Sequence, residues 1–158
     1  MTTLPADHRV TLEDLLSTVE SVLTGERDLI ANMANISALL FEALPDINWA
    51  GFYILRDGEL VLGPFQGRVA CTRIAVGRGV CGTAAARRST IVVPDVHAFP
   101  GHIACDTASE SEIVVPILDG DRLIGVLDID SPIRDRFTPQ DRLVLEQVAA
   151  LLVPAPTA

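Results

Sequence analysis

The chain has 158 residues and a formal net charge of −9, and all 12 of its basic residues are arginine. This length is typical of one domain, and a hydrophobic content of 49% predicts a packed core rather than disorder. The absence of lysine excludes Schiff-base chemistry and a Walker A phosphate loop. The acidic balance argues against nucleic acid or an anionic membrane surface as a partner.

The first residues do not have the pattern expected of a secretory signal. The first ten residues lack a basic start followed by an apolar stretch, and no apolar run approaches the roughly 20 residues that cross a bilayer. We therefore expect a cytoplasmic protein, in which thiols are kept reduced. A single domain is predicted over residues 1–158, with an ordered core over about residues 11–153.

Two helices are predicted at the start. Apolar side chains recur with helical spacing over residues 12–23, after the cap residue Thr11 and before Gly25. A second helix is expected over residues 28–44, where Pro45 ends it.

The middle of the chain has the pattern of strands. A hairpin is predicted around Asp57-Gly58. It is followed by a short strand, a glycine-rich run over residues 77–82, a short helix over 83–88, and another short strand. The expected strands here cover residues 49–55, 59–65, 72–76 and 91–93.

A long loop over residues 94–109 precedes a second hairpin and a last helix. The hairpin is expected to pair residues 112–118 with 122–130, and Thr138-Pro139 begins a helix that runs to about residue 152. Because hairpins dominate, we predict an α+β fold with a mainly antiparallel sheet, with the N- and C-terminal helices packed on one side and the long loop on the other. A loop of this length is usually functional, and its apolar residues favour an ordered lid.

Three cysteines lie in the middle third of the chain, at positions 71, 81 and 105. None is in a CxxC pair, so a zinc site built from cysteine pairs is not expected. Cys81 lies where the glycine-rich run meets the short helix, and free N–H groups there are expected to lower the pKa of its thiol. Cys105 lies in the long loop between His102 and Asp106, and Cys71 lies near Arg68 and Arg73. These surroundings favour reactive thiols over core residues.

Two aspartates end an otherwise apolar strand, and they demand an explanation. Asp128 and Asp130 are two residues apart, so their side chains share one face of the sheet. Glu112 on the paired strand can join them. One member of such a group titrates with a raised pKa and can donate a proton near neutral pH. The alternatives are a solvated face, or two caps of the turn at Ser131-Pro132.

These parts suit the reduction of a sulfoxide. The sulfoxide oxygen must be protonated when a thiolate attacks the sulfur, and the attacking cysteine becomes a sulfenic acid. A second cysteine then resolves the sulfenic acid as a disulfide.

The sequence resembles the free methionine-(R)-sulfoxide reductases, which are stand-alone GAF domain enzymes. The three cysteines at this spacing, together with the Asp128 and Asp130 pair, are the specific features of that family. The similar stretches are residues 48–53, 63–67, 77–84, 95–97, 100–106, 111–114 and 125–131.

The resemblance implies a role for each site residue. Cys105 is the nucleophile, Cys71 closes a disulfide with it, and Cys81 assists recycling or tunes the site. The other implied residues bind substrate: Trp49 forms a wall against its methyl group, and Glu112, Asp128 and Asp130 bind its sulfoxide and amine.

The same resemblance implies the partners. No cofactor or metal is bound, thioredoxin supplies reducing equivalents that come ultimately from NADPH, and the protein forms a homodimer through its N-terminal helices. Since the chain has no lysine, backbone N–H groups or an arginine are expected to bind the substrate carboxylate.

Two other functions remain open. One is a non-catalytic GAF module that senses a small ligand or its redox state. The other is a hydrolase that uses Cys105 with His97 or His102. The hydrolase has no use for Cys71 or the acidic pair.

Overall fold

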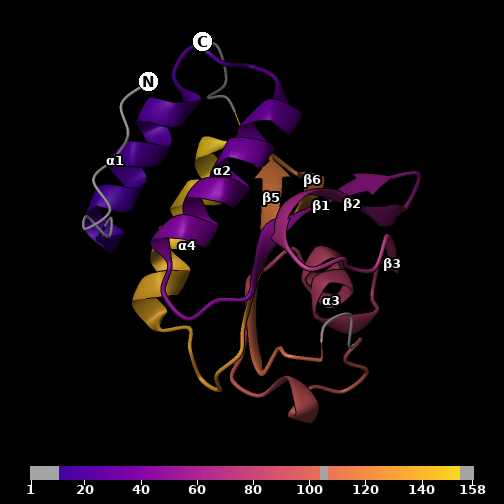
Figure 1. Cartoon of the computed structure of the whole chain (residues 1–158). Helices are drawn as coiled ribbons and strands as arrows, with labels where there is room; N and C mark the ends of the chain where they lie inside the picture. The colour runs from indigo at the N-terminus through magenta and orange to yellow at the C-terminus, as the bar shows by residue number, and fades with distance from the viewer. Residues whose placement is uncertain (1–10, 104–106, 154–158) are drawn as a thin grey trace.

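The computed structural model describes residues 11–103 and 107–153. Within them, six strands form one sheet in the order β3-β2-β1-β6-β5-β4, and each adjacent pair is antiparallel (Figure 1). The predicted antiparallel α+β sheet is therefore confirmed. The strands are β1 (Trp49–Arg56), β2 (Glu59–Gly67), β3 (Arg73–Ala75), β4 (Ile91–Val93), β5 (Ser111–Asp119) and β6 (Arg122–Ser131).

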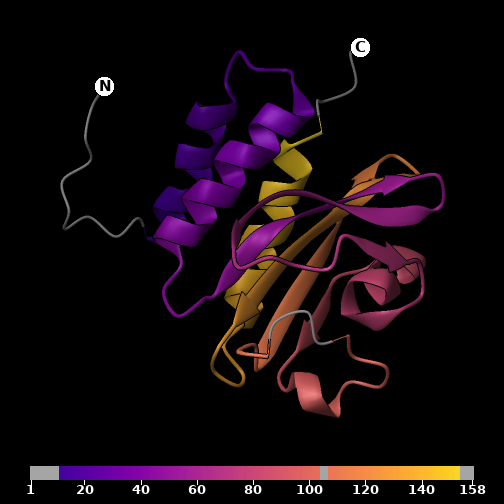
Figure 2. The ribbon, with the colours of Figure 1, turned by 45° about the vertical axis from the view of Figure 1, so that its right-hand side comes forward.

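Three long helices cover one face of this sheet (Figures 1 and 2). They are α1 (Leu12–Leu23), α2 (Leu29–Ala43) and α4 (Pro139–Leu151), and all three agree with the predicted helices to within a residue or two. The cap residues Thr11 and Asp28 accept hydrogen bonds from the first turns of α1 and α2, as the sequence predicts. Their apolar faces and one face of the sheet form a continuous core.

The opposite face of the sheet carries the fourth helix, α3 (Gly79–Arg87), and the segment that leads through the short 3-10 helix η1 (Val96–Ala98) (Figure 2). A second apolar cluster lies here, between the sheet and α3. The expectation that the N- and C-terminal helices pack on one side of the sheet is confirmed, and the short helix α3 lies on the other side. The described part of the long loop lies on the same side as α3, as expected.

The helix α3 also begins earlier than the sequence suggests, at Gly79 rather than at residue 83. The glycines of this run indicate a loop, because glycine disfavours helices. Here Gly82 is required by close packing, since a Cβ atom at this position would overlap the carbonyl oxygen of Ala75. Cys81 therefore lies inside the first turn of α3 and not in a loop.

Strand alternation separates the two faces. In β1, Ala50 and Phe52 belong to the helix-covered core, whereas Trp49 and Tyr53 belong to the cluster beside α3. Ile129 of β6 likewise faces the helix-covered core. The acidic residues Glu112, Asp128 and Asp130 alternate with such core residues and thus face α3. In the described part of the chain, no helix is both long and apolar enough to cross a membrane.

Candidate active site

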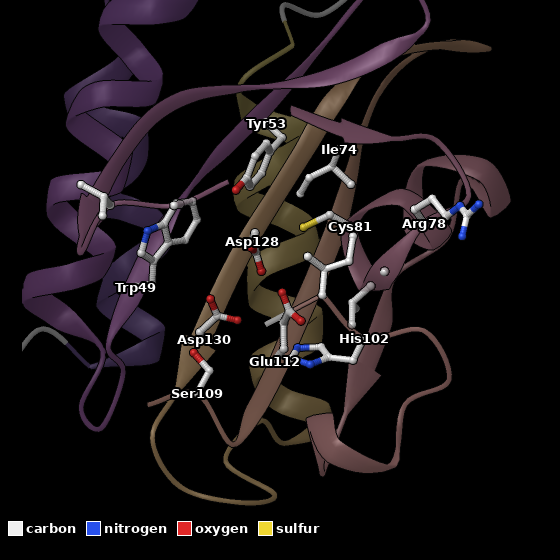
Figure 3. A pocket seen from close by; sticks show the side chains of 15 residues that line it. Trp49, Tyr53, Ile74, Arg78, Cys81, His102, Ser109, Glu112, Asp128 and Asp130 are labelled. Atoms are coloured by element: carbon white, nitrogen blue, oxygen red, sulfur yellow. The ribbon is translucent and has the colours of Figure 1, made fainter. Parts of the chain in front are cut away.

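A pocket opens on the α3 side of the sheet, where β1 and β5 begin and β6 ends beside the first turn of α3 (Figure 3). It encloses a cavity of about 40 Å³. The site residues predicted from sequence that the structure describes, Cys71 excepted, all line this pocket: Trp49, Cys81, Glu112, Asp128 and Asp130.

Strand register brings the three carboxyl groups together. Glu112 of β5 is paired directly with Asp130 of β6, and Asp128 precedes Asp130 on the same face. Glu112 and Asp128 are only 6% and 5% exposed, so this face is not solvated. The turn after β6 is capped instead by Ser131, whose hydroxyl accepts a hydrogen bond of 3.2 Å from the Ile133 N–H. Both alternatives for the aspartate pair are therefore wrong for Asp128.

The two buried carboxyl groups, Glu112 and Asp128, have raised pKa values. Burial, followed by the neighbouring Asp128 and Asp130, raises the pKa of Glu112 well above its usual value. Burial also raises the pKa of Asp128, while hydrogen bonds from Glu112 and Cys81 act in the opposite direction. Asp128 thus accepts hydrogen bonds from Glu112 and Cys81, and Glu112 retains its proton more strongly than Asp128 does. This confirms the expectation that one of these acids has a raised pKa.

Cys81 differs from its prediction. Its side chain is 5% exposed and packs in the cluster between α3 and the sheet. Burial, and then the carboxyl groups of Asp128, Glu112 and Asp130, raise the pKa of its thiol well above the usual value. The expected lowering by the helix N-terminus is wrong, because desolvation and three nearby acids outweigh the helix dipole. Cys81 is a neutral thiol that hydrogen-bonds to Asp128.

Stacked aromatic rings form one wall of the pocket. Trp49 stacks on Phe65 with 5.2 Å between ring centroids and on Tyr53 with 6.0 Å. The Trp49 indole Nε1 donates a hydrogen bond of 3.1 Å to the carbonyl oxygen of Arg68. The indole is thereby fixed in orientation, with its ring facing the pocket (Figure 3).

The same aromatic wall holds the segment that carries Cys71. The Tyr53 hydroxyl donates a hydrogen bond of 3.0 Å to the carbonyl oxygen of Cys71. Burial, and then Asp128, raise the pKa of Tyr53 above its usual value, so the hydroxyl keeps the proton that it donates. Cys71 itself is partly buried against the cluster beside α3 and is disulfide-bonded. Cys105, the predicted nucleophile, lies outside the described residues.

Several residues that line the pocket were not predicted from the sequence, Tyr53 and Ser109 among them. Tyr53 could have been found, because it lies four residues after Trp49 in one strand, an even spacing that places both side chains on the same face. Ser109 had no such signal, because it precedes β5 in an irregular segment; its hydroxyl accepts a hydrogen bond of 3.1 Å from the Asn48 side chain. Arg78 and the first turn of α3 also line the pocket, and no described side chain caps this helix start.

The two described histidines differ in burial. His102 lines the pocket and is partly buried, and burial, followed by the nearby His97, lowers the pKa of its imidazole. His97 is mostly exposed, and its Nε2 lies 3.2 Å from the Glu110 carboxylate.

Two groups of side chains have the spacing of metal ligands: the buried Cys81, Glu112 and Asp128, and the more exposed Asp95, His97 and Glu110. Arg134 contacts both acids of the second group, with nitrogen–oxygen distances of 4.0 Å to Asp95 and 3.7 Å to Glu110. A cation therefore already neutralises the second group, whereas the first group has no such partner among the described salt bridges.

A six-stranded antiparallel sheet with helices on one face and a pocket on the other defines a GAF domain, and the GAF domain family matches residues 9–155 of this chain. The free methionine-R-sulfoxide reductase of Escherichia coli K12 is 57% identical over 139 residues, which are 88% of this chain and 84% of that protein. The chain belongs to the family of the free methionine-(R)-sulfoxide reductases.

Solved structures of this family are closely similar. The structure of fRMsr of Staphylococcus aureus in complex with substrate has a TM-score of 0.87 and 50% identity, covering 96% of this chain and 97% of that chain. The free methionine-R-sulfoxide reductase from Neisseria meningitidis in complex with its substrate has a TM-score of 0.87 and 47% identity, covering 96% and 92%.

Proposed function

We propose that the protein reduces free L-methionine (R)-S-oxide to L-methionine and so protects cells against oxidative damage. The observation that carries this proposal is the buried Glu112, whose pKa is raised, beside Asp128 and Asp130 in a pocket walled by Trp49, in a chain of this family. A sulfoxide oxygen needs an acid when its sulfur is attacked, and Glu112 is an acid whose raised pKa keeps a proton available.

The pocket offers a partner for each part of a free amino acid. The acidic side, with Asp128 and Asp130, suits the substrate ammonium group, and the indole of Trp49 suits its methyl group. The carboxylate needs a positive partner. The start of α3 provides backbone N–H groups beside Arg78, and both line the pocket.

The proposed reaction has two steps on the protein. The thiolate of Cys105 attacks the sulfoxide sulfur, and Glu112 protonates the sulfoxide oxygen. The oxygen is transferred to the sulfur of Cys105, which becomes a sulfenic acid, and methionine is released. The thiol of Cys71 then attacks the sulfenic acid, which gives a Cys71–Cys105 disulfide and water. Thioredoxin reduces this disulfide, with NADPH as the ultimate electron source.

The state of the two described cysteines supports this assignment. Cys71 is disulfide-bonded, whereas Cys81 is a buried free thiol. A thiol with a raised pKa is a poor nucleophile. We therefore assign Cys81 to holding Asp128 and not to the disulfide exchange.

The remaining expectations concern the surroundings of the site. The loop over residues 94–109 closes over the ligand and excludes peptide-bound methionine sulfoxide, which lacks the free ammonium and carboxylate groups. A homodimer through α1 and α2 is consistent with the exposed Ile30 and Phe41 on α2. We expect the protein to act in the cytoplasm, where thioredoxin is reduced.

The test is NADPH consumption coupled through thioredoxin and its reductase, with the R and S epimers of free methionine sulfoxide assayed separately. The R epimer is expected to drive turnover, and the S epimer and a peptide-bound sulfoxide are not. The proposed activity is refuted if neither epimer drives NADPH consumption and neither is reduced when dithiothreitol replaces thioredoxin. Ligand binding without turnover would then favour the sensor.

A further inference from the structure

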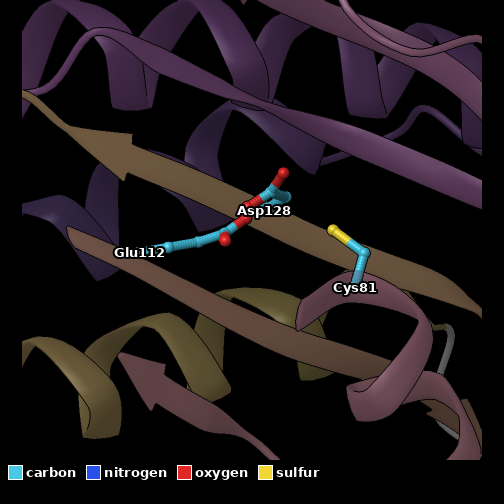
Figure 4. A group of neighbouring side chains, drawn as sticks. All are labelled: Cys81, Glu112 and Asp128. Carbon is cyan, nitrogen blue, oxygen red and sulfur yellow. The ribbon is translucent and has the colours of Figure 1, made fainter. Parts of the chain in front are cut away.

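Three buried ligand atoms converge from three separate elements of the pocket. The Sγ of Cys81 on α3 and a carboxylate oxygen from each of Glu112 on β5 and Asp128 on β6 lie within 4.8 Å of one another (Figure 4). All three residues are buried. Figure 4 shows Glu112 and Cys81 directed toward Asp128 from opposite sides.

An independent observation points to a missing ligand at this place. The Oδ1 atom of Asp128 is buried and has no hydrogen-bond partner among the described residues. Asp128 is 95% buried, given its exposed fraction of 5%, and it lines the pocket. A buried carboxylate oxygen without a partner is costly, and a bound cation removes that cost.

No basic side chain pairs with these acids in the described part of the chain. Arg78 and His102 are the basic residues among those that line the pocket. Neither forms a salt bridge with Glu112 or Asp128 within the described part of the chain. The site therefore favours a cation, and its donor set of one sulfur and two oxygens favours a thiophilic divalent ion.

We infer that Cys81, Glu112 and Asp128 form a binding site for Zn²⁺ or another thiophilic divalent cation, and that this ion excludes the substrate. Tetrahedral zinc takes thiolate sulfur at about 2.3 Å and carboxylate oxygen at about 2.0–2.2 Å, so ligand atoms approach to between three and four ångströms. Atoms that already lie within 4.8 Å reach this geometry by small side-chain movements.

The pocket also leaves space for the ion. The pocket that these three residues help to line has a cavity of about 40 Å³, which exceeds the roughly 10–15 Å³ that one water molecule needs. Three protein ligands and a water complete a four-coordinate site. The ion replaces the protons on Cys81 and Glu112 and occupies the place proposed for the sulfoxide.

The binding site does not depend on the reductase activity, whereas the exclusion of substrate rests on the proposed function. Binding is measured without turnover, on oxidised protein in which Cys71 is disulfide-bonded and Cys81 stays free. Cd²⁺ is the spectroscopic probe, because cadmium bound to a thiolate gives an ultraviolet charge-transfer band. One ion per chain is expected to produce this band, and calorimetry with Zn²⁺ is expected to give the same stoichiometry.

Variants assign the ion to these residues. Cys81→Ser is expected to abolish the band, and Cys81→Ser and Glu112→Gln are each expected to weaken Zn²⁺ binding more than tenfold. His97→Ala is the matched control, because it removes one ligand of the more exposed group and should leave binding unchanged. Circular dichroism and thermal unfolding establish that each variant is folded. A variant that does not fold is replaced by Asp128→Asn.

Methionine (R)-sulfoxide at saturating concentration is expected to displace Cd²⁺ from the wild-type protein. The inference is overturned if the band is absent, if folded Cys81→Ser keeps it, or if His97→Ala removes it. A Cd²⁺ band that substrate does not affect overturns the exclusion of substrate. A loss of NADPH consumption without metal concerns the proposed function alone.

Discussion

Glu112 on β5 lies directly opposite Asp130 on β6, in a pair of antiparallel strands that is buried on both faces. Two carboxyl groups in register repel each other if both are charged. The neighbouring Asp128 adds a third acid on the same face, and Glu112 responds by retaining a proton. A cross-strand pair that would weaken an ordinary sheet thus provides a proton donor in the pocket.

Replacing Glu112 with glutamine should stabilise the protein at high pH. Below the ordinary pKa of glutamate, both the folded and the unfolded chain hold the proton. As the pH rises, the unfolded chain releases it first, because the pKa of Glu112 is raised in the folded state, and stability falls. We expect Glu112→Gln to gain about 1–2 kcal/mol near pH 8 and almost nothing near pH 4.

Thermal unfolding across this pH range measures the effect, at about 2–4 °C per kcal/mol for a chain of this size. Glu42→Gln is the matched control, since Glu42 is exposed on α2. A Glu112→Gln variant that is less stable than the wild type at high pH would show that Glu112 is ionised in the folded protein.

Cys81 should act through its hydrogen bond and not through redox exchange. In Cys81→Ser, a hydroxyl can still donate to Asp128, so kcat/KM is expected to fall by less than about threefold. In Cys81→Ala, the Asp128 acceptor loses its donor, and a loss of about 1–3 kcal/mol predicts a fall of about tenfold or more. The measurement is methionine formation with dithiothreitol as reductant. Equal inactivity of both variants would indicate a redox role for the thiol.

Tyr53→Phe should separate the two chemical steps. The variant keeps the stack on Trp49 but loses the hydrogen bond to the Cys71 carbonyl, which contributes about 0.5–1.5 kcal/mol. Methionine release in the first turnover is expected to stay unchanged, while disulfide closure slows several-fold. Rapid quenching, followed by separate quantification of methionine and of free thiols, measures both rates. An equal slowing of both steps would place the hydroxyl in substrate binding.

Trp49 should report ligand binding directly. It is the single tryptophan of the sequence, and it is 3% exposed in the pocket wall. In a Cys105→Ser variant, which binds but cannot turn over, methionine (R)-sulfoxide is expected to change the tryptophan fluorescence with saturation. The S epimer serves as the control. If the wild-type enzyme turns over but the variant shows no change in fluorescence, Trp49 does not form part of the substrate-binding wall.

Much of this arrangement could be predicted from the sequence because it depends on local patterns. Apolar spacing gives α1, α2 and α4, and two-residue alternation places Asp128 and Asp130 on one face. The start of α3 could not be predicted, because Gly82 is needed for the close approach of the Ala75 carbonyl oxygen, which is seen only in the folded structure. The low pKa expected for Cys81 failed for the same reason. Its burial and its acid neighbours come from β5 and β6, which are distant in sequence.

The most direct test of the proposed chemistry is one turnover of fully reduced protein with methionine (R)-sulfoxide in the absence of reductant. The account predicts about one methionine per chain, and peptide mapping by mass spectrometry should find a Cys71–Cys105 disulfide with Cys81 still a thiol. No methionine, or a disulfide that contains Cys81, would contradict it.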